Sequence, residues 1–235
     1  MARSRIGFGL LGPRRERHAV SLDDLETLGV PVGDDGVVIG VDADERPAVL
    51  GVNQPTPYEI TLIGGLWTAQ VLALRAAATG TRVAVETGRA AAWTALVQAA
   101  GAGLPCVTLH DVGRVPPQGA SPGSPVLVVR DCGMRPPRGR VVSAPWQSVI
   151  TLLPYLSPAA PRLVEKSSVV GVQRLAPDEA RQIGRFLRLP PSEAEVLSTL
   201  ADGVTLWCSG RDRTFVMTQA TDAETGLLGT ARRMD

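Results

Sequence analysis

Lysine is almost missing from this chain: Lys and Arg together number 24, and Lys166 is the only lysine. The formal net charge is +1, and aromatic residues make up 4% of the sequence. A balanced charge creates no strong field to attract nucleic acid, and few aromatic side chains are available to stack on bases. The composition therefore argues against a nucleic-acid partner.

Cysteine and histidine are also scarce, with three and two copies. Cys106, Cys132 and Cys208 are widely spaced and odd in number, which fits neither a zinc cluster nor a disulfide framework. No apolar run approaches the ~20 residues that span a bilayer, and no signal-peptide pattern opens the chain. We expect reduced thiols, no metal site and a cytoplasmic location.

Apolar residues are plentiful, at 44% of 235 residues, which is enough for one sizeable core. The most informative stretch is Tyr58–Arg89. Tyr58–Ile63 has the β-branched, apolar character of a strand, Gly64-Gly65 predict a turn, and Leu66–Ala78 is spaced as a helix. Arg82–Glu86 then predicts a second buried strand. A β-turn-α-β unit of this kind is how nucleotide-binding α/β folds begin.

Strands and helices alternate along the rest of the chain, separated by Gly- and Pro-rich segments such as residues 113–125. The predicted strands are Val37–Asp42, Pro47–Val52, Leu104–Leu109, Val126–Val129, Arg140–Ser143, Ser168–Gln173, Val204–Trp207 and Thr214–Thr218. The predicted helices are Ala90–Ala100, Trp146–Leu156, Asp178–Leu187 and Ser192–Leu200. This alternation predicts a three-layer α/β fold with a mostly parallel, Rossmann-like or RecA-like sheet and β-hairpins near both ends.

The predicted domain organisation is simple. Residues 21–220 form a single α/β domain, residues 1–20 a basic and flexible arm, and residues 221–235 a loose tail. The arm is interpreted as a solvated terminus, and the alternative is peripheral contact with acidic lipid or with a partner protein.

The glycine turn is the first candidate site. A dinucleotide fingerprint is Gly-x-Gly-x-x-Gly/Ala, followed by an acid that binds the ribose. Gly64 begins the pattern and Ala69 ends it, but Leu66 stands where the second glycine must let the backbone approach a pyrophosphate. Glu86 follows at the end of the next strand, where the ribose-binding acid is expected. The candidate cofactor-binding residues are thus Gly64, Gly65, Ala69 and Glu86.

A phosphate-binding P-loop is the second interpretation of the same turn. That loop needs Gly-x-x-x-x-Gly-Lys-Ser/Thr, and no lysine lies near. Asp131 ends the apolar run Val126–Asp131 in the manner of a Walker-B acid, which adds it to the candidate set. Cys106 and His110 invite a nucleophile–base interpretation, but four strand residues span about 13 Å, so a structural histidine is the better interpretation.

The order of elements resembles the core of FtsK/SpoIIIE-type motor ATPases, including those of actinobacterial type VII (ESX) secretion systems. The resemblance covers residues 37–218 and includes a strand, an acidic helix, a Leu-x-Asp-Gly turn and a closing hairpin: Gln173–Leu175, Asp178–Ile183, Leu200–Gly203 and Val204–Trp207. It places the Walker-A position on Gly64–Thr68 and the Walker-B position on Asp131. Because the Walker-A lysine is missing, the resemblance implies a degenerate ATPase-like domain that packs against other proteins.

The sequence therefore favours a pseudo-ATPase interaction module of a type VII secretion or related translocation machine. Its expected partner is a secretion-machine protein or a second copy of the chain, and no cofactor is expected. One alternative is a nucleotide- or dinucleotide-binding enzyme that uses ATP/ADP or NAD. Another is an oligomeric scaffold with Trp67 or Trp93 exposed in a contact.

Overall fold

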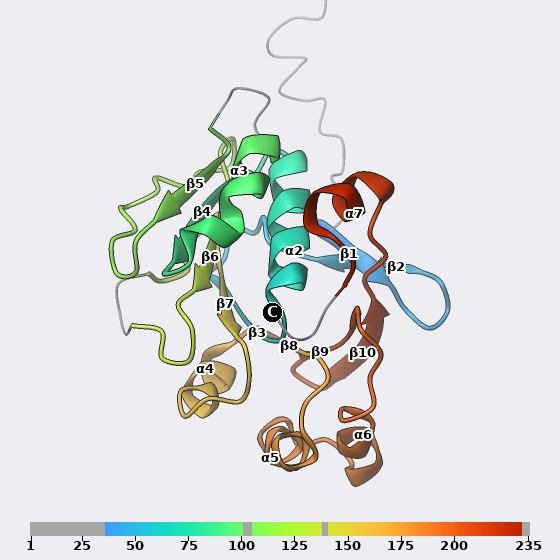
Figure 1. Cartoon of the computed structure of the whole chain (residues 1–235). Helices are drawn as coiled ribbons and strands as arrows, with labels where there is room; N and C mark the ends of the chain where they lie inside the picture. The colour runs from blue at the N-terminus through green and yellow to red at the C-terminus, as the bar shows by residue number, and fades with distance from the viewer. Residues whose placement is uncertain (1–35, 101–104, 138–140, 232–235) are drawn as a thin grey trace, which may run out of the picture. The chain divides into compact units, whose positions relative to one another are not determined.

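The computed structural model describes residues 36–100, 105–137 and 141–231 (Figure 1). The chain divides into two compact units, Met1–Gly33 and Asp34–Asp235, and every described residue belongs to the second. The predicted basic arm, residues 1–20, and Leu104 and Arg140 of two predicted strands lie outside the described residues. Among the described residues, no helix has the length and apolar content needed to cross a membrane.

Ten strands form one sheet in the order β2-β1-β10-β9-β8-β3-β7-β6-β4-β5 (Figure 1). The strands are β1 (Val37–Val41), β2 (Pro47–Leu50), β3 (Tyr58–Ile63), β4 (Arg82–Thr87), β5 (Val107–His110), β6 (Val126–Asp131), β7 (Gln147–Leu153), β8 (Val169–Val172), β9 (Val204–Ser209) and β10 (Asp212–Met217). The strands from β8 to β5 are all parallel, and the two hairpins extend the sheet by antiparallel pairing from β8 to β2. The carboxyl end of β3 therefore lies between those of β7 and β8.

Helices cover both faces of the sheet because its parallel strands are apolar on both sides. The helices are α2 (Leu66–Ala78), the 3₁₀ helix η1 (Ala90–Trp93), α3 (Thr94–Ala100), α4 (Ala160–Lys166), α5 (Pro177–Leu187), α6 (Pro191–Val196) and α7 (Asp222–Leu228). Ile60 and Leu62 of β3 pack in the core that contains α2, whereas Ile63 packs in the core that contains α5. Figure 1 shows α2, α3 and α7 grouped apart from α4, α5 and α6. The predicted three-layer α/β fold with a hairpin near each end of the described chain is confirmed.

One predicted element has the wrong type. Trp146–Leu156 was expected to be a helix behind Pro145, but Gln147–Leu153 forms β7, which pairs with both β3 and β6. Its side chains are buried on both faces, so sheet pairing outweighs the helix-start signal of the proline. Trp146 takes a left-handed backbone (φ 63°) that turns the chain into this strand. The predicted strand over Arg140–Ser143 also does not form in its described part.

The prediction of a loose tail over residues 221–235 is wrong for its described part, because α7 forms there. Thr221 and Glu224 make a reciprocal capping box at its start. Glu224 also forms a partly buried ion pair with Arg75 of α2, with Arg75 Nε 2.6 Å from Glu224 Oε1. Trp67 Nε1 donates to the Gly229 carbonyl at 2.9 Å. These contacts fix the end of the described chain against α2. The sequence analysis also missed α4.

Candidate functional site

The turn between β3 and α2 consists of Gly64 and Gly65 alone. The side chain of Gln173, which directly follows β8, lies against this turn. Gly65 N–H donates to Gln173 Oε1 at 2.7 Å, and Gln173 Nε2 donates to Thr68 Oγ1 at 2.6 Å and to Thr205 Oγ1 at 3.3 Å. Gln173, Thr68 and Thr205 are all buried. The amino end of α2 is thus capped by an amide from a neighbouring strand.

The amide of Gln173 lies against the Gly64–Gly65 turn, the turn for which the sequence suggested a Walker-A position. A Cβ atom at Gly64 would lie 2.4 Å from Gln173 Oε1, so glycine is required there by close approach. The crevice lined by Trp67, Thr68, Gln173 and Gly203 is too narrow to hold a water molecule. A two-residue turn also lacks the successive backbone N–H groups that wrap a phosphate in a P-loop.

Glu86, the candidate ribose-binding acid, is fully buried and uses both carboxylate oxygens within the chain. Arg130 Nε lies 2.5 Å from Glu86 Oε2, and Gly113 N–H donates to Glu86 Oε1 at 2.7 Å. Burial alone would raise the pKa of Glu86, but the hydrogen bonds from Arg130 and Gly113 hold it below its ordinary value of 4.5. Glu86 is therefore an ionised carboxylate that anchors the loop after β5 to the sheet.

Asp131, the candidate Walker-B acid, is equally engaged. Arg89 donates to both of its oxygens at 2.9 Å. Trp93 Nε1 donates to Oδ2 at 2.9 Å and Thr87 Oγ1 to the same atom at 3.0 Å. The Asp131 side chain is 1% exposed. Its role here is to fasten the segment that contains η1 to the carboxyl ends of β4 and β6.

The structure does not bring these candidates into one site. Glu86 pairs in register with Arg130, and Thr87 with Asp131, so the two carboxylates point to opposite faces of the sheet. β7 separates β3 from β6, which places Asp131 two strand spacings, about 10 Å, from the line of β3. Leu66 and Ala69 are buried in α2. The dinucleotide pattern is accordingly part of the core packing of this helix.

The remaining candidates are engaged elsewhere as well. Cys106 Sγ donates to the Ala100 carbonyl at 2.9 Å, and the His110 ring contacts Thr108 Oγ1 at 3.0 Å. Burial, followed by the charge of Glu86, raises the pKa of Cys132 to about 12, so this thiol is not a nucleophile at neutral pH. No group of three or more metal-ligating side chains occurs in the described part of the chain. Trp67 and Trp93, expected to be exposed in a scaffold, are 3% and 0% exposed.

The residues that fill these positions were not predicted from the sequence: Gln173, Arg89 and Trp93. Gln173 was assigned to a strand, and its only signal was a polar residue at the end of the apolar run that precedes it. Its contacts with Gly65 and Thr68 span more than a hundred residues of sequence, at separations of 108 and 105. No local pattern encodes such a contact.

Tryptophan-to-phenylalanine replacements should distinguish an indole N–H that donates a hydrogen bond from one that does not. Trp93 Nε1 donates to the Asp131 carboxylate, whereas Trp207 Nε1 is buried without a hydrogen-bond partner among the described residues. Trp93→Phe is expected to lower the free energy of unfolding by about 1.5–3 kcal/mol, because it removes a hydrogen bond to a charged group. Trp207→Phe removes a donor that has no partner. Its loss of unfolding free energy should therefore be smaller than that of Trp93→Phe by at least about 1 kcal/mol. Urea unfolding of both variants tests this, and equal losses would contradict it.

Stability should fall in acid because two buried carboxyls have lowered pKa values. Burial alone would raise the pKa of Glu224, but hydrogen bonds from Arg75 and Thr221 hold it, like that of Glu86, below 4.5. A carboxyl with a lowered folded pKa contributes stability above its unfolded pKa and loses it as pH falls through the folded pKa. Unfolding free energies should therefore be flat near neutrality and fall below about pH 4.5. Glu224→Gln should reduce the dependence of the unfolding free energy on pH below about pH 4.5. An unchanged pH dependence would show that the Glu224 carboxyl does not contribute to it.

No protein-family profile matches the sequence, and no curated protein matches it. Among solved structures, VirB4 of Thermoanaerobacter pseudethanolicus has a TM-score of 0.57 at 11% identity and covers 82% of this chain and 99% of its own. The described chain has the RecA-like α/β fold of VirB4. The resemblance to motor ATPases noted in the sequence is thus confirmed at the level of the fold, and the chemistry depends on the residues of this chain.

Two further structures are similar at lower scores. The cytoplasmic domain of the type VII secretion ATPase EccC of Thermomonospora curvata has a TM-score of 0.44 at 14% identity, covering 80% of this chain and 26% of its own. The genome packaging NTPase B204 of Sulfolobus turreted icosahedral virus 2, in complex with sulfate, has a TM-score of 0.45 at 11% identity. The match covers 72% of this chain and 98% of the B204 chain.

Proposed function

We propose that this protein is a non-hydrolysing, ATPase-like interaction module of a translocation machine, of the type VII secretion kind or a related one. The observation that carries the proposal is the amide of Gln173 on the Gly65 N–H, in the place where a P-loop ATPase holds phosphate. The RecA-like fold supplies the architecture of a motor domain, and its catalytic positions are used for internal contacts.

Three features of the chain support the loss of nucleotide chemistry. The turn has no lysine to neutralise the transferred phosphoryl group. Asp131, at the proposed Walker-B position, is ion-paired through both of its oxygens with Arg89, and this pairing competes with binding of a magnesium ion or its water. Cys132 follows it where a general base would stand, and its thiol has a pKa of about 12.

Two features support the interaction role. The order of elements over residues 37–218 follows the FtsK/SpoIIIE pattern, and the fold is that of VirB4 at a TM-score of 0.57. A motor-type domain that has lost turnover keeps its packing surfaces, which require only the fold. We propose that its partner is a protein of the same machine, and that this partner hydrolyses ATP.

The test measures phosphate release by the purified protein and by the complex that it captures from its own cells. The protein alone should release no more phosphate from Mg·ATP than its Asp131→Asn variant. The captured complex should hydrolyse ATP, because the activity belongs to the partner. Turnover by the isolated protein that Asp131→Asn abolishes would overturn the proposal.

A further inference from the structure

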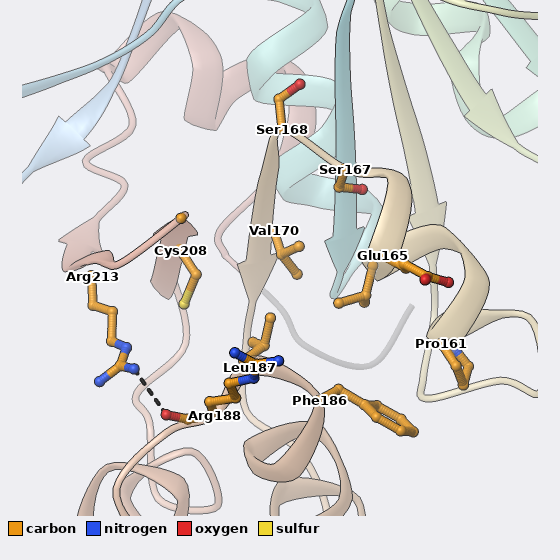
Figure 2. Close-up of a pocket in the computed structure, with 12 residues that line it drawn as sticks. Pro161, Glu165, Ser167, Ser168, Val170, Phe186, Leu187, Arg188, Cys208 and Arg213 are labelled. Atoms are coloured by element: carbon orange, nitrogen blue, oxygen red, sulfur yellow. Dashed lines mark hydrogen bonds between the residues drawn. The ribbon is translucent and has the colours of Figure 1, made fainter.

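A hollow lies beside the amino end of β8, at the opposite end of this strand from Gln173 (Figure 2). Its volume is about 490 Å³, within the range of ~300–1,000 Å³ that ligand pockets occupy. Val170 of β8, Leu187 of α5, Cys208 of β9 and Val164 of α4 contribute apolar surface. Glu165, Arg188 and Arg213 are its charged lining residues. The hollow is therefore an apolar pocket with one acid and two arginines around it.

Arg188 is held in an unusual conformation next to this pocket. It ends α5 in the left-handed region (φ 54°), at a position that favours glycine. Its carbonyl accepts from Arg213 Nη2 at 2.9 Å, and the following Leu189 N–H donates to the Gly184 carbonyl at 2.8 Å. A strained residue that persists where glycine would serve better is a reason to look for function in its side chain.

The guanidinium of Arg188 is available to a ligand. Arg188 is one of the residues that line the pocket, and Figure 2 shows it at the end of α5. Within the described residues, its side chain makes no hydrogen bond or ion pair, whereas Arg213 is occupied by the Arg188 carbonyl and by Glu193. An arginine in this setting binds a carboxylate in a bidentate, charge-assisted manner.

Phe186 adds an exposed aromatic ring to the same pocket, at 40% exposure. A small molecule is usually enclosed by its site, whereas an exposed aromatic side chain next to arginine is typical of a protein–protein contact. The exposed aromatic ring beside the Arg188 side chain therefore favours a segment of a protein as the occupant.

We propose that this pocket, which we call the Arg188 pocket, binds a protein segment that places a large apolar side chain beside a carboxylate. The apolar side chain contacts Val170, Leu187 and Phe186, and the carboxylate binds the Arg188 guanidinium. This inference rests on the proposed interaction role but not on the loss of nucleotide binding, so activity in an ATPase assay would not affect it.

The experiment uses fluorescent peptides with a central Leu or Phe next to Glu, and matched peptides with Gln in place of Glu. Fluorescence anisotropy of the whole protein should show binding of the Glu peptides and binding about tenfold or more weaker for the Gln peptides. Arg188→Gly should weaken the binding of the Glu peptides by a similar factor. Its melting temperature should be no lower than that of the wild type, because glycine suits the left-handed position.

The matched control is Arg181→Gln on the same helix, whose arginine pairs with Asp178 and does not line the pocket. It should bind the Glu peptides like the wild type, and Phe186→Ala should bind them more weakly. Equal binding of Glu and Gln peptides, or unchanged binding by Arg188→Gly, would overturn the proposal. Saturable binding of decanoate with no binding of any peptide would overturn it in favour of a small amphiphilic carboxylate.

Discussion

Asp131→Ala is expected to lower the free energy of unfolding by about 3–5 kcal/mol, although the sequence pattern suggested a Walker-B acid at this position. The replacement leaves Trp93 Nε1, Thr87 Oγ1 and the Arg89 guanidinium without their common acceptor. Trp93 and Thr87 are buried, so water does not replace the lost hydrogen bonds at low cost. A catalytic acid is usually dispensable for folding, whereas an acid that holds three donors is not.

Urea unfolding of Asp131→Ala and Asp202→Ala makes this comparison directly. Asp202 forms an exposed ion pair with Arg174, so its loss should change the unfolding free energy by no more than about 1 kcal/mol. An Asp131→Ala variant as stable as the wild type would show that Asp131 is free to serve a ligand, and the structural role assigned to it would be wrong.

The second large effect concerns Gln173 and Gly64. Gln173→Ala should lower the unfolding free energy by about 2–4 kcal/mol, because the Gly65 N–H and the Thr68 hydroxyl lose a buried partner. Gly64→Ala should also destabilise the protein, since its methyl group would lie 2.4 Å from Gln173 Oε1. The Gln173 amide cannot move aside without breaking its own hydrogen bonds.

The double variant decides whether these two residues compete for one space. With the Gln173 side chain gone, the methyl group of Gly64→Ala has room, so the two losses should not add and the coupling should reach about 1–3 kcal/mol. Gly88→Ala is the matched control, because the nearest atom to a Cβ there is Val112 Cγ2 at 3.8 Å. Strict additivity of Gly64→Ala and Gln173→Ala would show that the amide does not fill the turn.

Elements with a strong local pattern could be predicted from the sequence. The strand–turn–helix–strand unit from Tyr58 to Glu86 and both hairpins were predicted within a few residues, because apolar alternation and turn residues are local signals. β7 was mistaken for a helix because Pro145 marks a helix start equally well, and only pairing with β3 and β6 makes it a strand. α7 was missed although the Thr221–Glu224 capping spacing was present in the sequence.

The contacts of the candidate site could not be predicted from the sequence. That no lysine lies near the Gly64–Gly65 turn could be seen directly in the sequence. What fills that turn could not be seen, because Gln173 reaches it only through the parallel pairing of β8 with β3. Likewise, Glu86 and Asp131 look like ligands at strand ends until the register shows that Arg130 and Arg89 neutralise them.

The central claim is that the turn after β3 is filled by the protein itself and takes no nucleotide. The most direct test is a thermal-shift titration of the purified protein with ATP, ADP, NAD, NADP and FAD, with and without Mg²⁺. We predict no change in melting temperature with any of them. A ligand at a hundred times its Kd stabilises a protein by about 2.7 kcal/mol, so a rising melting temperature with ATP would contradict the account.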